Sequence, residues 1–191
     1  MTVLDEIADE ILKEKRIEKT FEDMVNGFEE KLEDNNFLDN SIEIKTYFGK
    51  GMGVASARTK LLKNKIIMKD WLDYTGDFKG LYIFLHNNKP FYFGISQGVI
   101  GRIIQHIKGK THNQATLAFN MGLMFYKLLN NNDYKGRRED FDFEKYVNPM
   151  KEFLLKQKIA FININDDDEL ALFEIYCSIK YKTILNSFET H

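Results

Sequence analysis

Short apolar runs separated by polar turns mark the middle of this chain. Leu81–Leu85 and Phe91–Ile95 are aromatic and β-branched, a composition typical of strands. Between them, His86–Pro90 contains the asparagines and the proline of a turn. The pattern therefore predicts a β-hairpin, and the similar run Ile159–Ile164 predicts a third strand.

Helical spacing covers most of the remaining chain. Residues 3–34 carry apolar side chains mostly three and four positions apart, which predicts one long amphipathic helix or two in series. Ser41–Tyr47 alternates like a short strand. Further helices are expected over residues 55–73, 98–108, 114–129, 150–156 and 165–180. The expected fold is α/β, of the α+β kind: a small three-stranded sheet flanked by helices over residues 77–191, with a mainly helical extension over residues 1–76.

Composition narrows the class of protein. The chain has 191 residues, 43% of them hydrophobic, which is normal for a domain that buries a core. A single cysteine, Cys177, rules out an internal disulfide and gives no zinc pattern. The first residues are acidic where a signal peptide would be basic, and no apolar run approaches the ~20 residues that span a bilayer. We expect a cytoplasmic protein without membrane contact.

Charge is segregated along the chain although the net charge is only −2. The first 40 residues are strongly acidic, whereas residues 44–69 contain seven basic side chains and no acidic one. A local positive field attracts polyanions, although a solvated basic helix paired with the acidic block explains the pattern equally well. The residues expected to contact nucleic acid are Lys60, Lys63, Lys65, Lys108, Lys110, Arg137 and Arg138.

Four side chains around the hairpin have the chemistry to act on a phosphodiester. Each strand contributes a tyrosine, Tyr82 or Tyr92, and the next helix carries Arg102 and His106 four positions apart on one face. A guanidinium fork donates two hydrogen bonds to phosphate oxygens, and an imidazole accepts a proton near neutral pH. Taken singly, each residue also has a purely structural explanation. The two tyrosines could be core side chains, and Arg102 and His106 could be a polar pair on the helix surface.

Glu174 is the candidate for holding a metal ion. It lies among Leu170, Phe173 and Ile175 on the last helix, where an ionised carboxylate without a cation partner is costly to bury. A hard cation such as Mg²⁺ suits this oxygen donor, and a solvent-facing glutamate is the alternative. The acidic run Asp166–Asp168 is instead expected to complement the dipole at the start of that helix.

Together these residues resemble the GIY-YIG nuclease family. The two signature triplets stand here as Gly80-Leu81-Tyr82 and Tyr92-Phe93-Gly94. Arg102 and His106 have the spacing of the family's arginine and its histidine or tyrosine, Glu174 matches the metal-binding glutamate, and Asn186 matches the final asparagine. The resemblance covers about residues 80–191. Leu81 and Phe93 replace the usual isoleucines, and the segment 130–150 is longer than a minimal family core.

The resemblance implies a divalent-metal-dependent DNA endonuclease. Glu174 would hold one Mg²⁺ or Mn²⁺, and Arg102 would clamp a phosphoryl oxygen. Tyr82 assisted by His106, or His106 directly, would deprotonate the attacking water, and these two assignments stay open. Tyr92 would orient the phosphate or water, and Asn186 would brace the site.

The biological setting is left open by the same resemblance. A restriction-like or mobile-element-like endonuclease is the leading hypothesis. A repair or structure-selective nuclease is a second one, and a non-catalytic nucleic-acid-binding module on the same fold is a third. Residues 1–76 lie outside the resemblance, and we expect them to bind DNA or to form a homodimer.

Overall fold

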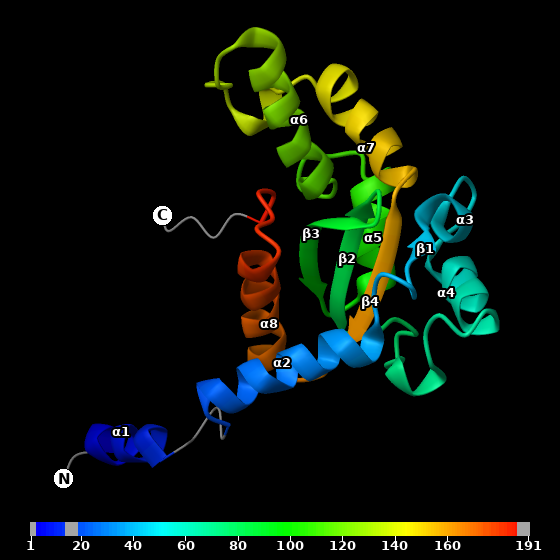
Figure 1. Cartoon of the computed structure of the whole chain (residues 1–191). Coiled ribbons are helices and arrows are strands. Elements are labelled where there is room, and N and C mark those ends of the chain that lie inside the picture. The colour runs from blue at the N-terminus through cyan, green and yellow to red at the C-terminus, as the bar shows by residue number, and fades with distance from the viewer. Residues whose placement is uncertain (1–2, 14–18, 187–191) are drawn as a thin grey trace.

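The computed structural model describes residues 3–13 and 19–186 and has one mixed helical and β-sheet architecture (Figure 1). The strands are β1 (Ile42–Glu43), β2 (Gly80–His86), β3 (Lys89–Ser96) and β4 (Lys158–Asn163). The helices are α1 (Val3–Lys13), α2 (Phe21–Asn35), α3 (Ile44–Phe48), α4 (Val54–Lys63), α5 (Val99–Lys108), α6 (Thr116–Asn130), α7 (Asn148–Leu155) and α8 (Asp167–Lys180). Single turns of 3₁₀ or π helix occur at 69–71, 138–140 and 143–147.

The sheet is antiparallel, in the order β1-β4-β2-β3. Strands β2 and β3 form the predicted hairpin. The turn residues Asn87 and Asn88 both have positive φ angles, 51° and 60°, as a tight two-residue hairpin turn requires, and asparagine tolerates them. Because β3 is an edge strand, its outer hydrogen-bonding groups are available to side chains from elsewhere.

The sheet has four strands rather than the three predicted. Ile42 and Glu43 pair with Ile159 and Lys158 of β4, so β1 occupies the edge opposite β3. The predicted strand over 41–47 is only two residues long, because Ile44 begins the short helix α3 and is completely buried there. The sheet therefore includes a strand from the predicted N-terminal extension.

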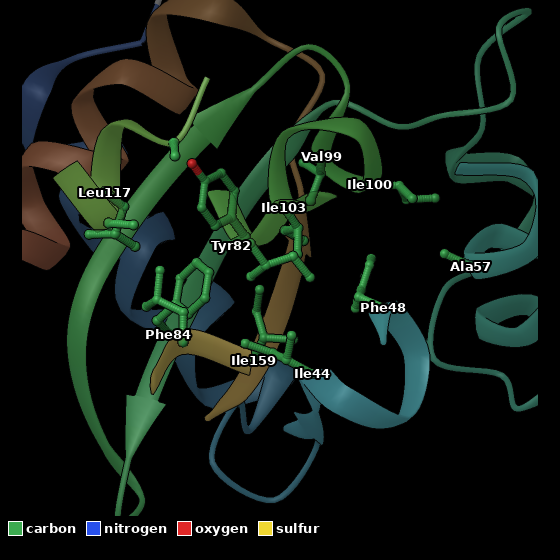
Figure 2. Packing of buried hydrophobic residues seen from close by; sticks show 14 of the residues in the cluster. Ile44, Phe48, Ala57, Tyr82, Phe84, Val99, Ile100, Ile103, Leu117 and Ile159 are labelled. Atoms are coloured by element: carbon green, nitrogen blue, oxygen red, sulfur yellow. The ribbon is translucent and has the colours of Figure 1, made fainter. Parts of the chain in front are cut away.

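Side-chain alternation in the strands builds a core on each face of the sheet. On one face Tyr82, Phe84 and Ile159 pack under α3, α4, α5, α6 and α7. Figure 2 shows Tyr82 among these buried side chains, with its hydroxyl oxygen pointing away from them. On the other face Leu81 and Ile162 pack against α2 and α8. The molecule is thus a helix–sheet–helix sandwich.

The N-terminal helices differ in their packing. The first described part of the predicted long helix is α1, residues 14–18 lie outside the described residues, and α2 follows as a separate helix. In α2, Phe28 stacks on Phe173 of α8, with ring centroids 4.7 Å apart. In α1, Leu4 and Ile11 are largely exposed. A role of this region in DNA binding or dimerisation stays a prediction.

No helix in the described ranges combines the length and the apolar character needed to cross a bilayer.

Candidate active site at the edge of the sheet

The hairpin brings the two signature tyrosines to one face. Tyr82 lies opposite Gly94 and Tyr92 lies opposite Phe84 in the β2–β3 register, and the two tyrosine rings are 6.1 Å apart, centroid to centroid. Tyr82 is 1% exposed, whereas Tyr92 is only partly buried. The inner tyrosine is therefore fixed by core packing, and the outer one faces the edge of the sheet.

Gly94 makes room for the Tyr82 ring. A Cβ atom built at Gly94 would lie 2.4 Å from Cζ and 2.5 Å from Oη of Tyr82, distances at which one of the two must move. The glycine of the second triplet thus has a steric role: its missing side chain is the space that the first triplet's tyrosine fills.

We expect Gly94→Ala to destabilise the fold by about 1–3 kcal/mol, because overpacking displaces the Tyr82 ring. Thermal unfolding measures this directly. Gly27→Ala in α2 is the matched control: nothing lies within 4 Å of a Cβ at Gly27, so this change should stabilise the protein by roughly 0.5–1 kcal/mol. Equal melting temperatures for the two variants would contradict the packing role of Gly94.

Helix α5 supplies the next two side chains and is held at its first turn by a buried carboxylate. Asp77 accepts hydrogen bonds from the backbone N–H groups of Ile100 and Gly101, at 2.8 and 2.9 Å, which satisfies donors that a helix start leaves free. This anchor, which the sequence reading missed, fixes α5 against the start of β2. Arg102 and His106 then lie on the face turned toward the hairpin.

His106 is completely buried and bonded on both ring nitrogens. Its Nε2 lies 2.8 Å from the Tyr82 Oη, and its Nδ1 accepts a hydrogen bond from the backbone N–H of Leu117 at 3.4 Å. A neutral imidazole that accepts at Nδ1 carries its proton on Nε2. His106 is therefore assigned as a hydrogen-bond donor to the Tyr82 hydroxyl oxygen.

Arg102 is held by Gln105 of its own helix and by polar groups at the start of α6. Its guanidinium donates to Oε1 of Gln105 at 3.0 Å, to Oγ1 of Thr116 at 3.2 Å and to the backbone oxygen of Gln114 at 3.4 Å. Among the described residues it has no carboxylate partner within salt-bridge distance. Its positive charge is thus available to an anion.

Glu174, on α8, and Asn186, in the chain after α8, lie at the edge of β3 that does not pair with β2. The Asn186 amide pairs with the open edge of that strand: Oδ1 accepts from the Phe93 N–H at 3.0 Å, and Nδ2 donates to the Phe93 carbonyl at 2.5 Å. Nδ2 also lies 3.4 Å from Oε1 of Glu174. The asparagine therefore links the glutamate of α8 to the tyrosine strand.

A cavity of about 270 Å³ lies between these groups. Its lining residues are Tyr92, Thr116, Leu117, Asn120, Glu174, Leu185 and Asn186. Larger hollows, of about 480 Å³ near Trp71 and about 580 Å³ near His86, contain none of the six predicted catalytic residues. The smaller cavity is the one that combines a carboxylate, a phenol and side-chain amides beside Arg102.

Burial sets the protonation states of the site. It raises the pKa of Glu174 from its ordinary 4.5 to about 7, and it lowers the pKa of His106 to about 3, an effect that the nearby Arg102 charge reinforces. Burial also raises the pKa of Tyr82 well above 10. The neighbouring Tyr92 raises this pKa further, and the Arg102 charge lowers it. At neutral pH the imidazole and the phenol are neutral, and Glu174 is close to its midpoint.

The donor set around Glu174 fits a hard divalent cation. The carboxylate is half-buried, has no basic partner among the described salt bridges, and faces a cavity lined with further oxygen donors. Within the described ranges no three or more His, Cys, Asp or Glu side chains cluster as a metal site. A cation at Glu174 would therefore take most of its ligands from water and substrate, as Mg²⁺ does.

The basic residues expected to bind nucleic acid divide into two groups. Four of them are engaged within the protein. Lys60 donates to the Thr46 carbonyl at 2.6 Å, Lys108 donates to the Gly49 carbonyl at 2.7 Å, Arg137 pairs with Asp140, and Arg138 lies over the Phe119 ring.

The side chains of the other three, Lys63, Lys65 and Lys110, are exposed and make no hydrogen bond or ion pair with any described residue. The structure does not bring the seven together at the cavity, since they lie on α4, on α5 and in the loops that follow α4, α5 and α6.

Comparisons with known proteins return no match: the sequence fits no family model, and it matches no curated protein and no solved structure.

Proposed function

We propose that this chain is a divalent-metal-dependent DNA endonuclease of the GIY-YIG type. The observation that carries the proposal is a convergence of the six residues chosen from sequence spacing. Tyr92, Glu174 and Asn186 line one cavity at the edge strand. Tyr82 lies next to Tyr92 and bonds to His106, and Arg102 bonds to Thr116 in the cavity wall. Core packing accounts for the burial of Tyr82 and His106, but it does not account for the polar groups of Arg102, Glu174 and Asn186 beside them.

The roles of the residues follow from their contacts. Arg102, fixed by Gln105 and Thr116, offers its remaining N–H groups to a phosphoryl oxygen, where its charge is worth most as negative charge develops. Tyr92 and the Asn186 amide border the cavity in which the phosphate would lie. When bound at Glu174, Mg²⁺ or Mn²⁺ would stabilise the negative charge of the phosphate and the leaving oxygen.

Tyr82 is favoured over His106 as the group that accepts the proton of the attacking water. His106 is 0% exposed, has its Nδ1 occupied by the Leu117 N–H and directs Nε2 to the Tyr82 oxygen. Both of its ring nitrogens are therefore engaged, and its Nε2–H stabilises a phenolate at Tyr82 by donating to it. His106 is thus a positioning residue, and Tyr82 is the base.

Substrate binding would draw on the basic side chains that have no partner among the described residues. The side chains of Lys63, Lys65 and Lys110 are free to contact phosphates. Lys60 instead ties α4 to Thr46 of α3, and Lys108 ties α5 to the loop before α4. Backbone contacts of this kind weaken steeply as salt rises.

Cleavage of supercoiled plasmid tests the proposal. We expect metal-dependent cutting by the wild type, none with a chelator, and a loss of about 100- to 1,000-fold in Arg102→Ala. Arg137→Ala is the control: its guanidinium pairs with Asp140 away from the cavity, so its effect should be confined to DNA affinity. DNA binding without cutting in any metal would favour the non-catalytic module, and neither binding nor cutting would refute the function.

A further inference from the structure

Asn120 is a polar residue whose position packing does not explain. It interrupts the apolar run from Leu117 to Phe125 within α6. Asparagine disfavours a helix interior because its side chain competes for backbone hydrogen bonds. A residue that breaks the local pattern without a compensating contact marks a site where function outweighs stability.

The contacts around the cavity single out the same side chain. Thr116 donates to the Asn113 carbonyl and accepts from Arg102, and the Asn186 amide is engaged with Phe93 and Glu174. Asn120 lines the cavity and is half-buried, and its side-chain amide makes no hydrogen bond to any described residue. Its amide is therefore the uncommitted polar group facing the space beside Glu174.

The size of the cavity indicates what lies between the two residues. The cavity of about 270 Å³ is several times the roughly 30 Å³ of one water molecule, so it has room for a cation together with waters, which is how Mg²⁺ is usually bound. Such a cation needs hydrogen-bond acceptors for its waters opposite the carboxylate. The side-chain carbonyl of Asn120 is one.

We propose that Asn120 is part of the metal site, and that its Oδ1 accepts a hydrogen bond from a water molecule on the divalent cation held by Glu174. The inference rests on the proposed function and extends it from α8 to α6, so that the cation would be held between two helices on opposite sides of the sheet edge. Outer partners of this kind contribute about 10- to 100-fold to metal affinity.

Titration of the full chain with Mn²⁺, with free Mn²⁺ measured by electron paramagnetic resonance, tests this without DNA or turnover. We expect Asn120→Leu, which preserves the volume of the side chain, to weaken Mn²⁺ binding about tenfold or more. Asn120→Asp should bind at least as tightly as the wild type, because it offers a second carboxylate. The control is Asn130→Leu on the same helix, whose amide bonds to the Tyr126 carbonyl and does not line the cavity.

The outcomes separate this inference from the proposed function. Loss of Mn²⁺ binding in Glu174→Ala together with wild-type affinity in Asn120→Leu overturns the role of Asn120 alone. Wild-type protein that binds no Mn²⁺ overturns both. If Asn120→Leu does not fold, weaker binding by Asn120→Asp than by the wild type still overturns the inference.

Discussion

Replacing Glu174 by glutamine should abolish cleavage and yet make the fold more stable above neutral pH. The amide keeps the shape of the side chain but supplies no charge for the cation, so we expect a loss of at least about 1,000-fold in cleavage, which is of the order found when a main charge-stabilising group is removed. Plasmid cleavage at saturating metal measures this loss.

The stability gain follows from the burial of the carboxyl group. Burial raises its pKa from 4.5 to about 7, so between these values the folded state keeps a proton that the unfolded chain has released. Wild-type stability from this group is therefore present below about pH 4.5, falls as pH rises to about 7 and stays low above it. Glutamine cannot ionise, so the melting temperature of Glu174→Gln should exceed that of the wild type increasingly across this window.

Thermal melts without metal at about pH 5 and about pH 8 test this difference. Glu152→Gln, an exposed glutamate on α7, should change neither cleavage nor the pH dependence of melting. A difference between Glu174→Gln and wild type that is the same at both pH values would show that the pKa of Glu174 is not raised by burial.

Tyr82→Phe should reduce cleavage by about 100- to 10,000-fold, the usual contribution of a positioned general base, while Mn²⁺ binding is retained. The base must be deprotonated, and burial raises the pKa of Tyr82 well above 10. The wild-type rate should therefore rise with pH through the alkaline range, and the residual rate of Tyr82→Phe should lack this rise. Single-turnover cleavage as a function of pH measures both.

Two controls accompany this variant. Tyr74→Phe changes a fully exposed tyrosine and should leave cleavage unaltered. Removing the Tyr82 hydroxyl leaves the His106 Nε2–H unpaired, at a cost of about 1–3 kcal/mol, so the comparison is made well below the melting temperature of the variant. A pH profile of Tyr82→Phe parallel to that of the wild type would assign the proton transfer to another group.

The hairpin and α5 could be predicted because local sequence determines them. Asn87 and Asn88 supply the positive φ angles of the turn. In α5 the buried residues Val99, Ile103 and Ile107 recur at helical spacing. The contact between Tyr82 and His106 also needs α5 to be held against β2, and Asp77, which does this, was not predicted.

Three features of the structure were not predicted from the sequence, one for a local reason and two for tertiary reasons. The helix expected over 55–73 ends at Lys63, and Lys65 then adopts a positive φ of 56°, a reversal that no glycine or proline announces. Strand β1 is two residues long and forms because it pairs with the free edge of β4. That pairing depends on the tertiary structure and cannot be predicted from the local sequence. Asn120 stands out in the sequence as a lone amide in an apolar helix. Its position beside Glu174 could not be predicted, because the cavity between them forms only when the chain folds.

The side chain of Asn186 forms hydrogen bonds with the backbone of edge strand β3, as a neighbouring strand would. One amide side chain both donates to and accepts from the Phe93 backbone, so at this point the edge of the sheet is already paired. Open strand edges are where chains add to one another and aggregate. The residue that borders the candidate site thus also shields the sheet edge from self-association, and the same two hydrogen bonds serve both purposes in the proposed enzyme.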